Sequence, residues 1–147
     1  MKDDPSSAAK ARYVLDTSAI LTLREDEAGA DQVEAILRDA DKGKGIVYVS
    51  FMTYMETYYR IFQIEGEESA KRTYAELKSL PVQQISPDEI ILLQAGSIKA
   101  TYRLSVADAW IIASALRMQA TLVHKDPEFE QVAHIVPMLK LPYKEGG

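Results

Sequence analysis

Four carboxylate side chains lie close to the ends of apolar segments in this 147-residue sequence. Two follow short strand-like runs, and two lie within the first two turns of helix-like segments; they are Asp16, Glu56, Asp108 and Asp126. A group of carboxylates can bind Mg²⁺ or Mn²⁺ through oxygen alone, and a cation held in this way can activate a water molecule for hydrolysis. This chemistry requires that the fold bring the four residues together.

Each aspartate also has a purely structural explanation. Asp16 and Asp126 each precede a helix-like segment and could cap it. Asp108 could close a capping box that Ser105 begins, because the two residues are three positions apart. Capping acids are common in proteins, so no single aspartate establishes a site.

Glu56 likewise has more than one explanation. It follows Thr53 by three residues, with which it could form a capping box, and it precedes Arg60 by one helical turn, with which it could form an ion pair. A chemical role for Glu56 therefore depends on whether it lies near the three aspartates.

The pattern of apolar residues predicts the elements that must position these acids. Short apolar runs predict strands at residues 13–15, 46–49, 82–85 and 120–123, and a last edge strand at 135–136. Apolar residues at helical spacing predict helices at 17–24, 28–40, 51–64, 67–80, 87–102, 106–118 and 128–132. Because strands and helices alternate, we expect an α/β fold, a three-layer α/β/α sandwich around a central parallel sheet of four to five strands.

Some of these helices carry further detail. Ser86 and Pro87 predict the start of the helix at 87–102, with Ser86 as its cap. The helix at 51–64 is predicted to carry an apolar stripe, formed at helical spacing by Phe51, Met55, Tyr58 and Phe62 and widened by Tyr54 and Ile61. The helix at 106–118 is apolar on nearly all sides and is expected to be buried.

The predicted sheet brings the four acids to one place. In a parallel sheet, the carboxyl ends of the strands and the amino ends of the following helices lie at one edge. Asp16 and Asp126 follow strands directly, and Glu56 lies within two turns of a strand's end. Asp108 opens a helix that must run antiparallel to the strands, so all four acids are expected at that edge. Repulsion and burial would raise their pKa values unless a cation relieves them. The absence of cysteine and of paired histidines favours Mg²⁺ or Mn²⁺ over zinc, in a site suited to metal-assisted phosphodiester hydrolysis.

Composition and charge exclude several classes of protein. With 47% hydrophobic residues the chain can bury the core of one domain, and the absence of cysteine excludes disulfide frameworks and thiolate sites and fits the cytoplasm. A net charge of −5 argues against a general nucleic-acid coat protein, though not against a nuclease. No segment is apolar and long enough to predict a membrane span. The predicted domain covers residues 13–143, between a flexible N-terminal extension at 1–12 and a C-terminal tail at 144–147.

Four pieces of sequence, in this order, match a known pattern. They are Val-Leu-Asp-Thr-Ser at 14–18, Glu56, Leu-Ser-Val-Ala-Asp-Ala at 104–109 with Ile-Ile-Ala at 111–113, and Thr-Leu-Val-His-Lys-Asp-Pro-Glu-Phe at 121–129. Through them the chain resembles the PIN-domain ribonucleases, most closely the VapC-type toxins of bacterial and archaeal toxin–antitoxin pairs. The Leu-Ser-Val-Ala-Asp segment is the most specific piece.

The resemblance implies a metal-dependent endoribonuclease in which the four acids bind the metal and are catalytic. Thr17, Ser18 and Ser105 would orient these ligands or a metal-bound water. Where the family often has a second aspartate before phenylalanine, this chain has Glu128, so that either Asp126 or Glu128 could face the metal. The resemblance also implies RNA as the substrate, a homodimer, and a separately encoded antitoxin protein as a partner.

Other residues could contribute to binding. Three basic residues could contact RNA phosphates beside the acids, namely Lys99, Arg103 and Lys125. Basic side chains near helix ends also commonly interact with the helix dipole instead. The lone His124 is expected to be structural, and the aromatic residues of the helix at 51–64 to form core and dimer contacts rather than to stack on bases.

Two other functions are compatible with acids at strand ends. One is a housekeeping PIN nuclease in RNA processing, and the other is a non-catalytic Mg²⁺-binding α/β module such as a receiver-like signalling domain. Receiver domains need paired acids after the first strand, whereas Thr17 and Ser18 follow Asp16 here. A phosphatase with an Asp-x-Asp nucleophile is disfavoured because Ser18 stands at its second acidic position.

Overall fold

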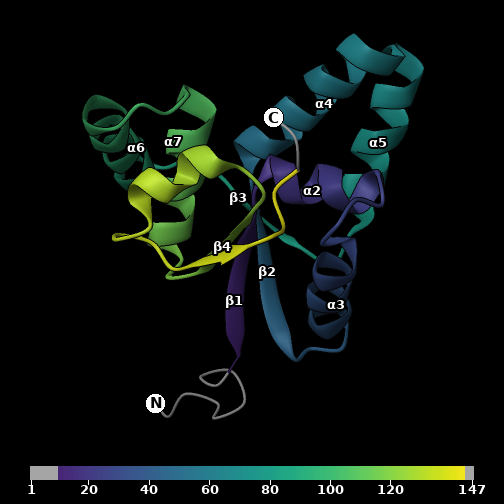
Figure 1. Cartoon of the computed structure of the whole chain (residues 1–147), viewed down its shortest axis with the longest axis horizontal. Helices are drawn as coiled ribbons and strands as arrows, with labels where there is room; N and C mark the ends of the chain where they lie inside the picture. Colours follow the sequence, from purple (N-terminus) through teal and green to yellow (C-terminus); the bar gives the residue numbers. More distant parts are fainter. Residues whose placement is uncertain (1–9, 145–147) are drawn as a thin grey trace.

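A computed structural model describes residues 10–144, and a parallel sheet lies at its centre (Figure 1). The strands are β1 (Ala11–Leu15), β2 (Gly45–Ser50), β3 (Gln83–Ile85), β4 (Thr121–His124) and β5 (Met138–Lys140). Their order in the sheet is β3-β2-β1-β4-β5, and every neighbouring pair is parallel. The predicted sandwich around a parallel sheet is confirmed.

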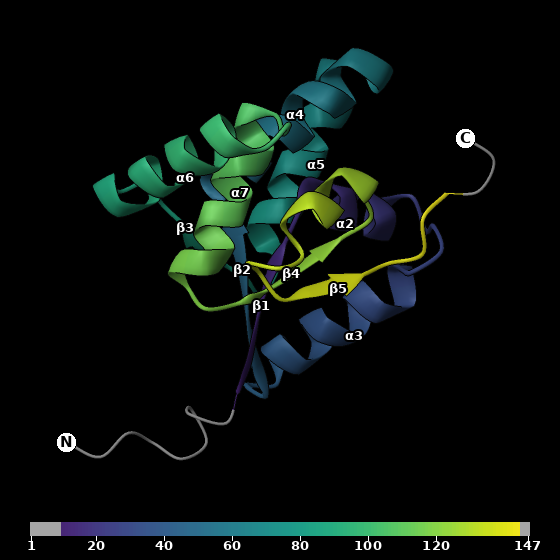
Figure 2. The ribbon, with the colours of Figure 1, turned by 60° about the vertical axis from the view of Figure 1, so that its left-hand side comes forward.

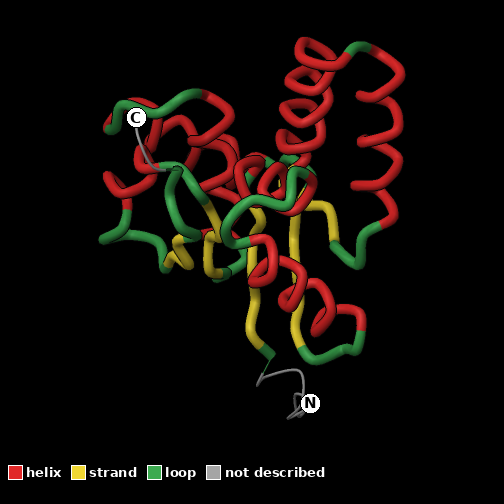
Figure 3. Tube along the Cα trace, turned by 45° about the vertical axis from the view of Figure 1, so that its right-hand side comes forward, coloured by secondary structure: helices red, strands yellow, loops and turns green. Residues whose placement is uncertain are grey.

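Helices cover both faces of this sheet (Figure 2). The helices are α2 (Thr17–Arg24), α3 (Ala30–Asp41), α4 (Phe51–Glu65), α5 (Glu67–Ser79), α6 (Glu89–Thr101), α7 (Val106–Arg117) and the short 3₁₀ helix η1 (Pro127–Val132). Helices α6 and α7 pack on one face, and α2 and α3 pack on the other. The hairpin of α4 and α5 extends beyond the carboxyl edge of the sheet (Figure 3).

The hydrophobic core has two parts because side chains alternate between the faces of each strand. In β1, Val14 packs with α6 and α7, whereas Leu15 packs with α2 and α3, and both are fully buried. Helix α7 lies under the sheet with residues on most of its sides buried, including Ile111 and Ile112. This burial confirms the prediction for α7 and fixes the position of its first turn relative to β1.

The predicted chain ends lie mostly outside the described residues. Of the extension predicted at 1–12, residues 1–9 lie outside them, and Ala11 and Arg12 belong to β1, where they pair with Gly45 and Ile46. Of the predicted tail, residues 145–147 also lie outside them. Within residues 10–144, no helix has the length and apolar character needed to cross a membrane.

The last strand is not where the sequence predicted it. The amides of Ile135 and Val136 both donate to the carbonyl of Val132, so these residues close the turn after η1 instead of forming a strand. Pairing with β4 begins at Met138, which lies opposite Leu122. The β-branched residues at 135–136 bury part of the core from within a turn, which explains why their composition was misleading.

One helix cap needs correction, and the apolar stripe predicted on α4 is only partly buried. Asp88 rather than Ser86 caps α6, because its carboxylate accepts a hydrogen bond of 2.7 Å from the amide of Ile91, and the helix begins after Pro87. In α4 the buried face is formed by Tyr54, Ile61 and two threonines, while Met55 and Phe62 are 51% and 43% exposed. Helix α4 packs against α2, α5, α7 and β2, and within residues 10–144 part of its apolar surface stays exposed.

Candidate metal centre

Asp16 lies at the junction of β1 and α2, with its side chain 3% exposed. Its Oδ2 accepts hydrogen bonds from the amide and hydroxyl of Ser18, at 2.9 and 2.5 Å, and so caps α2. Its Oδ1 is buried and has no hydrogen-bond partner among residues 10–144. The helix cap therefore uses one oxygen of Asp16 and leaves the other available to a ligand.

Asp108 enters the same region from the first turn of α7. The hydroxyl of Ser105 caps the helix by accepting a hydrogen bond of 3.1 Å from the amide of Asp108. Burial of α7 against the sheet places this turn beside the end of β1, as the sequence predicted from the direction of the helix. Asp108 is 9% exposed, so its carboxylate has little contact with water.

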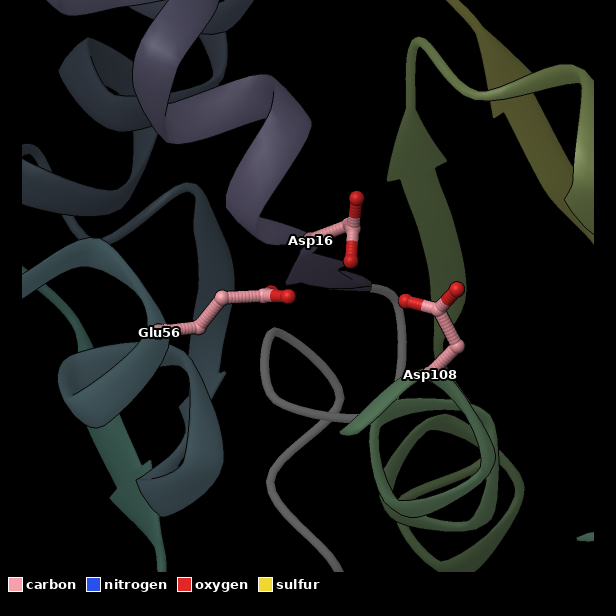
Figure 4. Close-up of side chains that lie close together, drawn as sticks. All are labelled: Asp16, Glu56 and Asp108. Carbon is pink, nitrogen blue, oxygen red and sulfur yellow. The ribbon is translucent and has the colours of Figure 1, made fainter. Parts of the chain in front are cut away.

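Glu56 completes a group of three carboxylates. One oxygen each from Glu56, Asp16 and Asp108 lie within 4.8 Å of one another, and the three side chains point toward a common centre (Figure 4). The two structural alternatives for Glu56 are not realised in residues 10–144, because the Thr53 hydroxyl has no hydrogen-bond partner and no ion pair joins Glu56 to Arg60. The position of Glu56 is explained by the cluster instead.

Asp126 belongs to a second group that shares Asp108. Carboxylate oxygens of Asp108, Asp126 and Glu128 lie within 4.8 Å of one another, whereas the first group does not include Asp126. Asp126 also caps η1, since its Oδ1 accepts a hydrogen bond of 2.9 Å from the amide of Glu128. Both candidates for the fourth ligand are thus near Asp108.

Burial and mutual repulsion raise the pKa values of the two most enclosed carboxyls. Loss of solvent raises the pKa of Asp16 to about 6, even though hydrogen bonds from Ser18 lower it. Loss of solvent, followed by repulsion from Asp16, Glu56 and Asp126, raises the pKa of Asp108 to about 8. A divalent cation would relieve both effects, and the unpaired Oδ1 of Asp16 is a ready ligand. The residues present therefore fit a hard, oxygen-bound metal ion.

The hydroxyl groups predicted to orient the ligands differ in their contacts. Ser18 donates to Asp16 and accepts a hydrogen bond of 2.8 Å from the amide of Lys125, so it ties the end of β1 to the end of β4. The hydroxyl of Thr17 is buried without a partner in the described chain. Ser105 acts on the backbone of Asp108. Ser18 is therefore the best placed of the three to fix a carboxylate.

His124 has the structural role expected of a lone histidine. It is fully buried at the end of β4, and its Nδ1 accepts a hydrogen bond of 3.1 Å from the amide of Asp126. Burial lowers the pKa of His124, which keeps the ring neutral and Nδ1 free to accept. The histidine thereby fixes the backbone that carries Asp126.

The three predicted basic residues lie in different settings. Lys99 is exposed in the last turn of α6, where the helix dipole accounts for it, and the backbone of exposed Arg103 is held by the side chain of Gln131. Lys125 is different, because its side chain is only 4% exposed and lies beside Glu27. Sequence reasoning missed Arg60 as a possible contact residue, although its spacing of one turn from Glu56 was a usable signal.

Comparison with known proteins agrees with this geometry. Residues 13–135 match the family model described as PIN domain. No curated protein matches the sequence of this chain.

Three solved structures share the fold at low sequence identity. VapBC2 from Rickettsia felis, bound to a promoter DNA fragment, is 14% identical with a TM-score of 0.70, and the match covers 89% of this chain and 99% of that one. VapBC-1 from nontypeable Haemophilus influenzae is 23% identical with a TM-score of 0.64, covering 88% and 97%. VapC20 from Mycobacterium tuberculosis, a toxin that cleaves the sarcin-ricin loop, is 18% identical with a TM-score of 0.64, covering 82% and 94%.

Proposed function

This chain belongs to the PIN-domain family, and from that membership we propose that it is a metal-dependent endoribonuclease that hydrolyses RNA phosphodiester bonds. One observation carries the proposal: three carboxylates from three separate elements converge within 4.8 Å of one another. Such a convergence is unfavourable without a cation, because it buries like charges. Its oxygen-only composition favours Mg²⁺ or Mn²⁺.

In this proposal Asp16, Glu56 and Asp108 hold the metal, and Asp126 or Glu128 adds a further ligand. When bound, the metal supplies an activated water and positive charge that offsets the charge developing on the phosphate. The PIN-domain assignment also replaces the receiver-like interpretation of the same acids.

The remaining side chains keep the ligands in place. Ser18 holds one oxygen of Asp16 and so fixes the direction of the other, while the neutral ring of His124 fixes the amide of Asp126. Because these contacts are buried, the ligands lose little conformational entropy when the metal and substrate bind.

Cleavage of RNA by variants of the purified protein tests this mechanism. With Mn²⁺ or Mg²⁺ present, Asp16→Asn and Asp108→Asn should each lower the cleavage rate by about 100-fold or more, because each removes a charged ligand while conserving shape. Asp88→Asn is the matched control, since asparagine can still cap α6 and Asp88 lies outside the carboxylate cluster. Cleavage that survives both cluster substitutions would refute the mechanism.

We further propose that the protein is the toxin of a toxin–antitoxin pair, acting in the cytoplasm as a homodimer. The similarity in fold to VapBC complexes supports this proposal, as do the apolar side chains that stay exposed on α4 and α6 in the single chain. Expression should arrest growth, and co-expression of a small neighbouring gene product should restore it. Normal growth under expression of an active nuclease would instead favour a housekeeping enzyme of RNA processing.

A further inference from the structure

A pocket of about 340 Å³ lies beside the carboxylate cluster, and we call it the basic pocket. Its lining includes Ser18, Glu27, Arg60, Lys125, Asp126 and Lys144. Two of these residues also belong to the candidate metal centre: Ser18 holds Asp16, and Asp126 lies near Asp108. The basic pocket therefore borders the place where a phosphate would be cut.

Lys125 is the most unusual residue of the basic pocket. Its side chain is 4% exposed, yet its Nζ is 3.8 Å from the nearest carboxylate oxygen, on Glu27, which is too far for a hydrogen bond. Glu27 is closer to Lys144, at 2.9 Å. An ammonium group has three donors and is unfavourable when buried without acceptors. Lys125 is thus a cation with an almost fully covered side chain, whose ammonium group is held in the described residues only by a long ion pair with Glu27 and can take further acceptors from the pocket.

The charges of the basic pocket do not balance. Arg60 is exposed and forms no ion pair with another residue of the described chain, so its guanidinium adds a second unmatched positive charge. Glu27 is shared between Lys125 and Lys144, and Asp126 lies within the acidic group of Asp108, so that the three cations of the lining outnumber its two carboxylates. A local excess of positive charge in a chain of net charge −5 points to an anionic ligand.

The two cations are placed on the same elements as the acids. Lys125 precedes Asp126 directly, and its amide donates to Ser18, which in turn donates to Asp16. Arg60 lies one turn after Glu56 on α4. An anion bound by Lys125 and Arg60 would therefore be held at a fixed place relative to the carboxylates.

We propose that the basic pocket binds a phosphate of the RNA strand next to the phosphate that is cut, with Lys125 and Arg60 as its ligands. This inference rests on the proposed nuclease function. RNA is favoured over an acidic peptide because the pocket adjoins the metal centre, through which the substrate strand must pass. Its role is to set which phosphate lies over the carboxylates.

The test measures binding of a short fluorescent RNA in EDTA, where no cleavage interferes. Lys125→Met and Arg60→Met should each weaken binding about tenfold and reduce the slope of log affinity against log salt by about 0.7 to 1. Lys71→Met is the matched control, because Lys71 is an exposed lysine on α5 outside the basic pocket. Arg60 is exposed, so its variant keeps the fold even if Lys125→Met is destabilised.

A set of RNAs with one neutral methylphosphonate each identifies the bound phosphate. At one position, the methylphosphonate should weaken RNA binding by the unmodified protein about tenfold. It should not weaken binding by the two pocket variants any further, because they have already lost the same contact. Equal effects of every methylphosphonate on all proteins would overturn the proposal, as would unchanged binding by both variants. Tighter competition by oligoglutamate than by RNA would also overturn it and assign the pocket to a protein partner.

Cleavage with Mn²⁺ is measured separately, so that the two proposals can fail independently. If the protein cuts RNA but the pocket variants respond to the methylphosphonates as the unmodified protein does, only the proposed phosphate site is contradicted. A protein that shows the coupling but does not cut RNA would contradict the nuclease function and leave the phosphate site supported.

Discussion

At the scale of single residues, Asp16 uses its two carboxylate oxygens differently. Oδ2 caps α2 through Ser18, and Oδ1 is buried without a partner in residues 10–144. The cap holds the carboxylate of Asp16 in place, and the Asp16 side chain lies with Glu56 and Asp108 around one centre. Helix capping and metal binding are therefore compatible roles of one side chain, because a strand end that meets a helix start is also the edge at which such sites form.

The raised pKa values of Asp16 and Asp108 predict how the metal-free protein responds to pH. Both are higher in the folded protein, about 6 and about 8, than in an unfolded chain, so folding is favoured by protonation. Their contribution to stability is complete below the ordinary carboxyl pKa and is lost as pH rises through these values. Thermal denaturation in EDTA should give a melting temperature that falls by about 5 °C or more between pH 6 and pH 9.

Two comparisons show whether the fall in melting temperature comes from Asp16 and Asp108 or from other titrating groups. Mg²⁺ or Mn²⁺ should remove most of the fall, because the cation stabilises the ionised carboxylates. Asp108→Asn should show a smaller fall in EDTA and little stabilisation by metal, since the buried charge is gone. If the melting temperature has the same pH dependence in Asp108→Asn as in the unmodified protein, Asp108 does not have the raised pKa.

The sequence predicted that all four acids meet at one edge of the sheet, and the three that form one group in the structure lie in regular elements. Asp16 and Asp108 stand at the first turns of helices and Glu56 in the second turn of one, so the direction of each helix was enough to place them. Asp126 lies before a 3₁₀ turn, and its grouping with Glu128 depends on the path of that turn, which no periodic pattern encodes.

At the scale of secondary structure, regular elements were again predicted better than turns and edge segments. Long helices and buried strands were predicted well because burial shapes their sequences: α3 buries one side, with Val33 and Leu37, and α7 is buried on most of its sides. The last strand was misplaced because β5 is short and lies at the sheet edge, where composition says little. The apolar stripe of α4 was predicted, but how much of it is buried was not, since a sequence does not reveal whether an apolar stripe meets its own chain or another.

Arg24 connects the element that carries Asp16 to the α4–α5 hairpin. Its guanidinium donates to both carboxylate oxygens of Glu65, at 2.8 and 2.9 Å, and its Nε donates to the hydroxyl of Thr73. Arg24→Met should lower the melting temperature by about 3–6 °C, because the buried Thr73 hydroxyl loses its donor and the paired hydrogen bonds to Glu65 are lost. Arg38→Met is the control, since Arg38 forms only an exposed ion pair with Glu34 on α3. Equal shifts in the two variants would contradict a connecting role for Arg24.

At the scale of the whole molecule, the described single chain leaves apolar side chains uncovered on several helices, chiefly on α4 and α6. On α4 they include Met55, Phe62 and Ile64, and on α6 they include Leu93. Homodimer interfaces are more apolar than the rest of a protein surface, so either helix could carry the proposed dimer. The α4–α5 hairpin projects beyond the sheet, which gives its apolar face room to meet a second copy (Figure 1).

A charge placed on each helix distinguishes the two faces. We expect Phe62→Glu to convert the dimer to a monomer in sedimentation velocity, because a carboxylate buried in an apolar interface loses its hydration without gaining a partner. The same change should leave the far-ultraviolet circular dichroism unchanged, since Phe62 is 43% exposed in the single chain. Leu93→Glu adds the same charge to α6, where Leu93 is 64% exposed, and should leave the dimer intact. Dissociation by Leu93→Glu alone would move the interface to α6, and a monomeric unmodified protein would refute the homodimer itself.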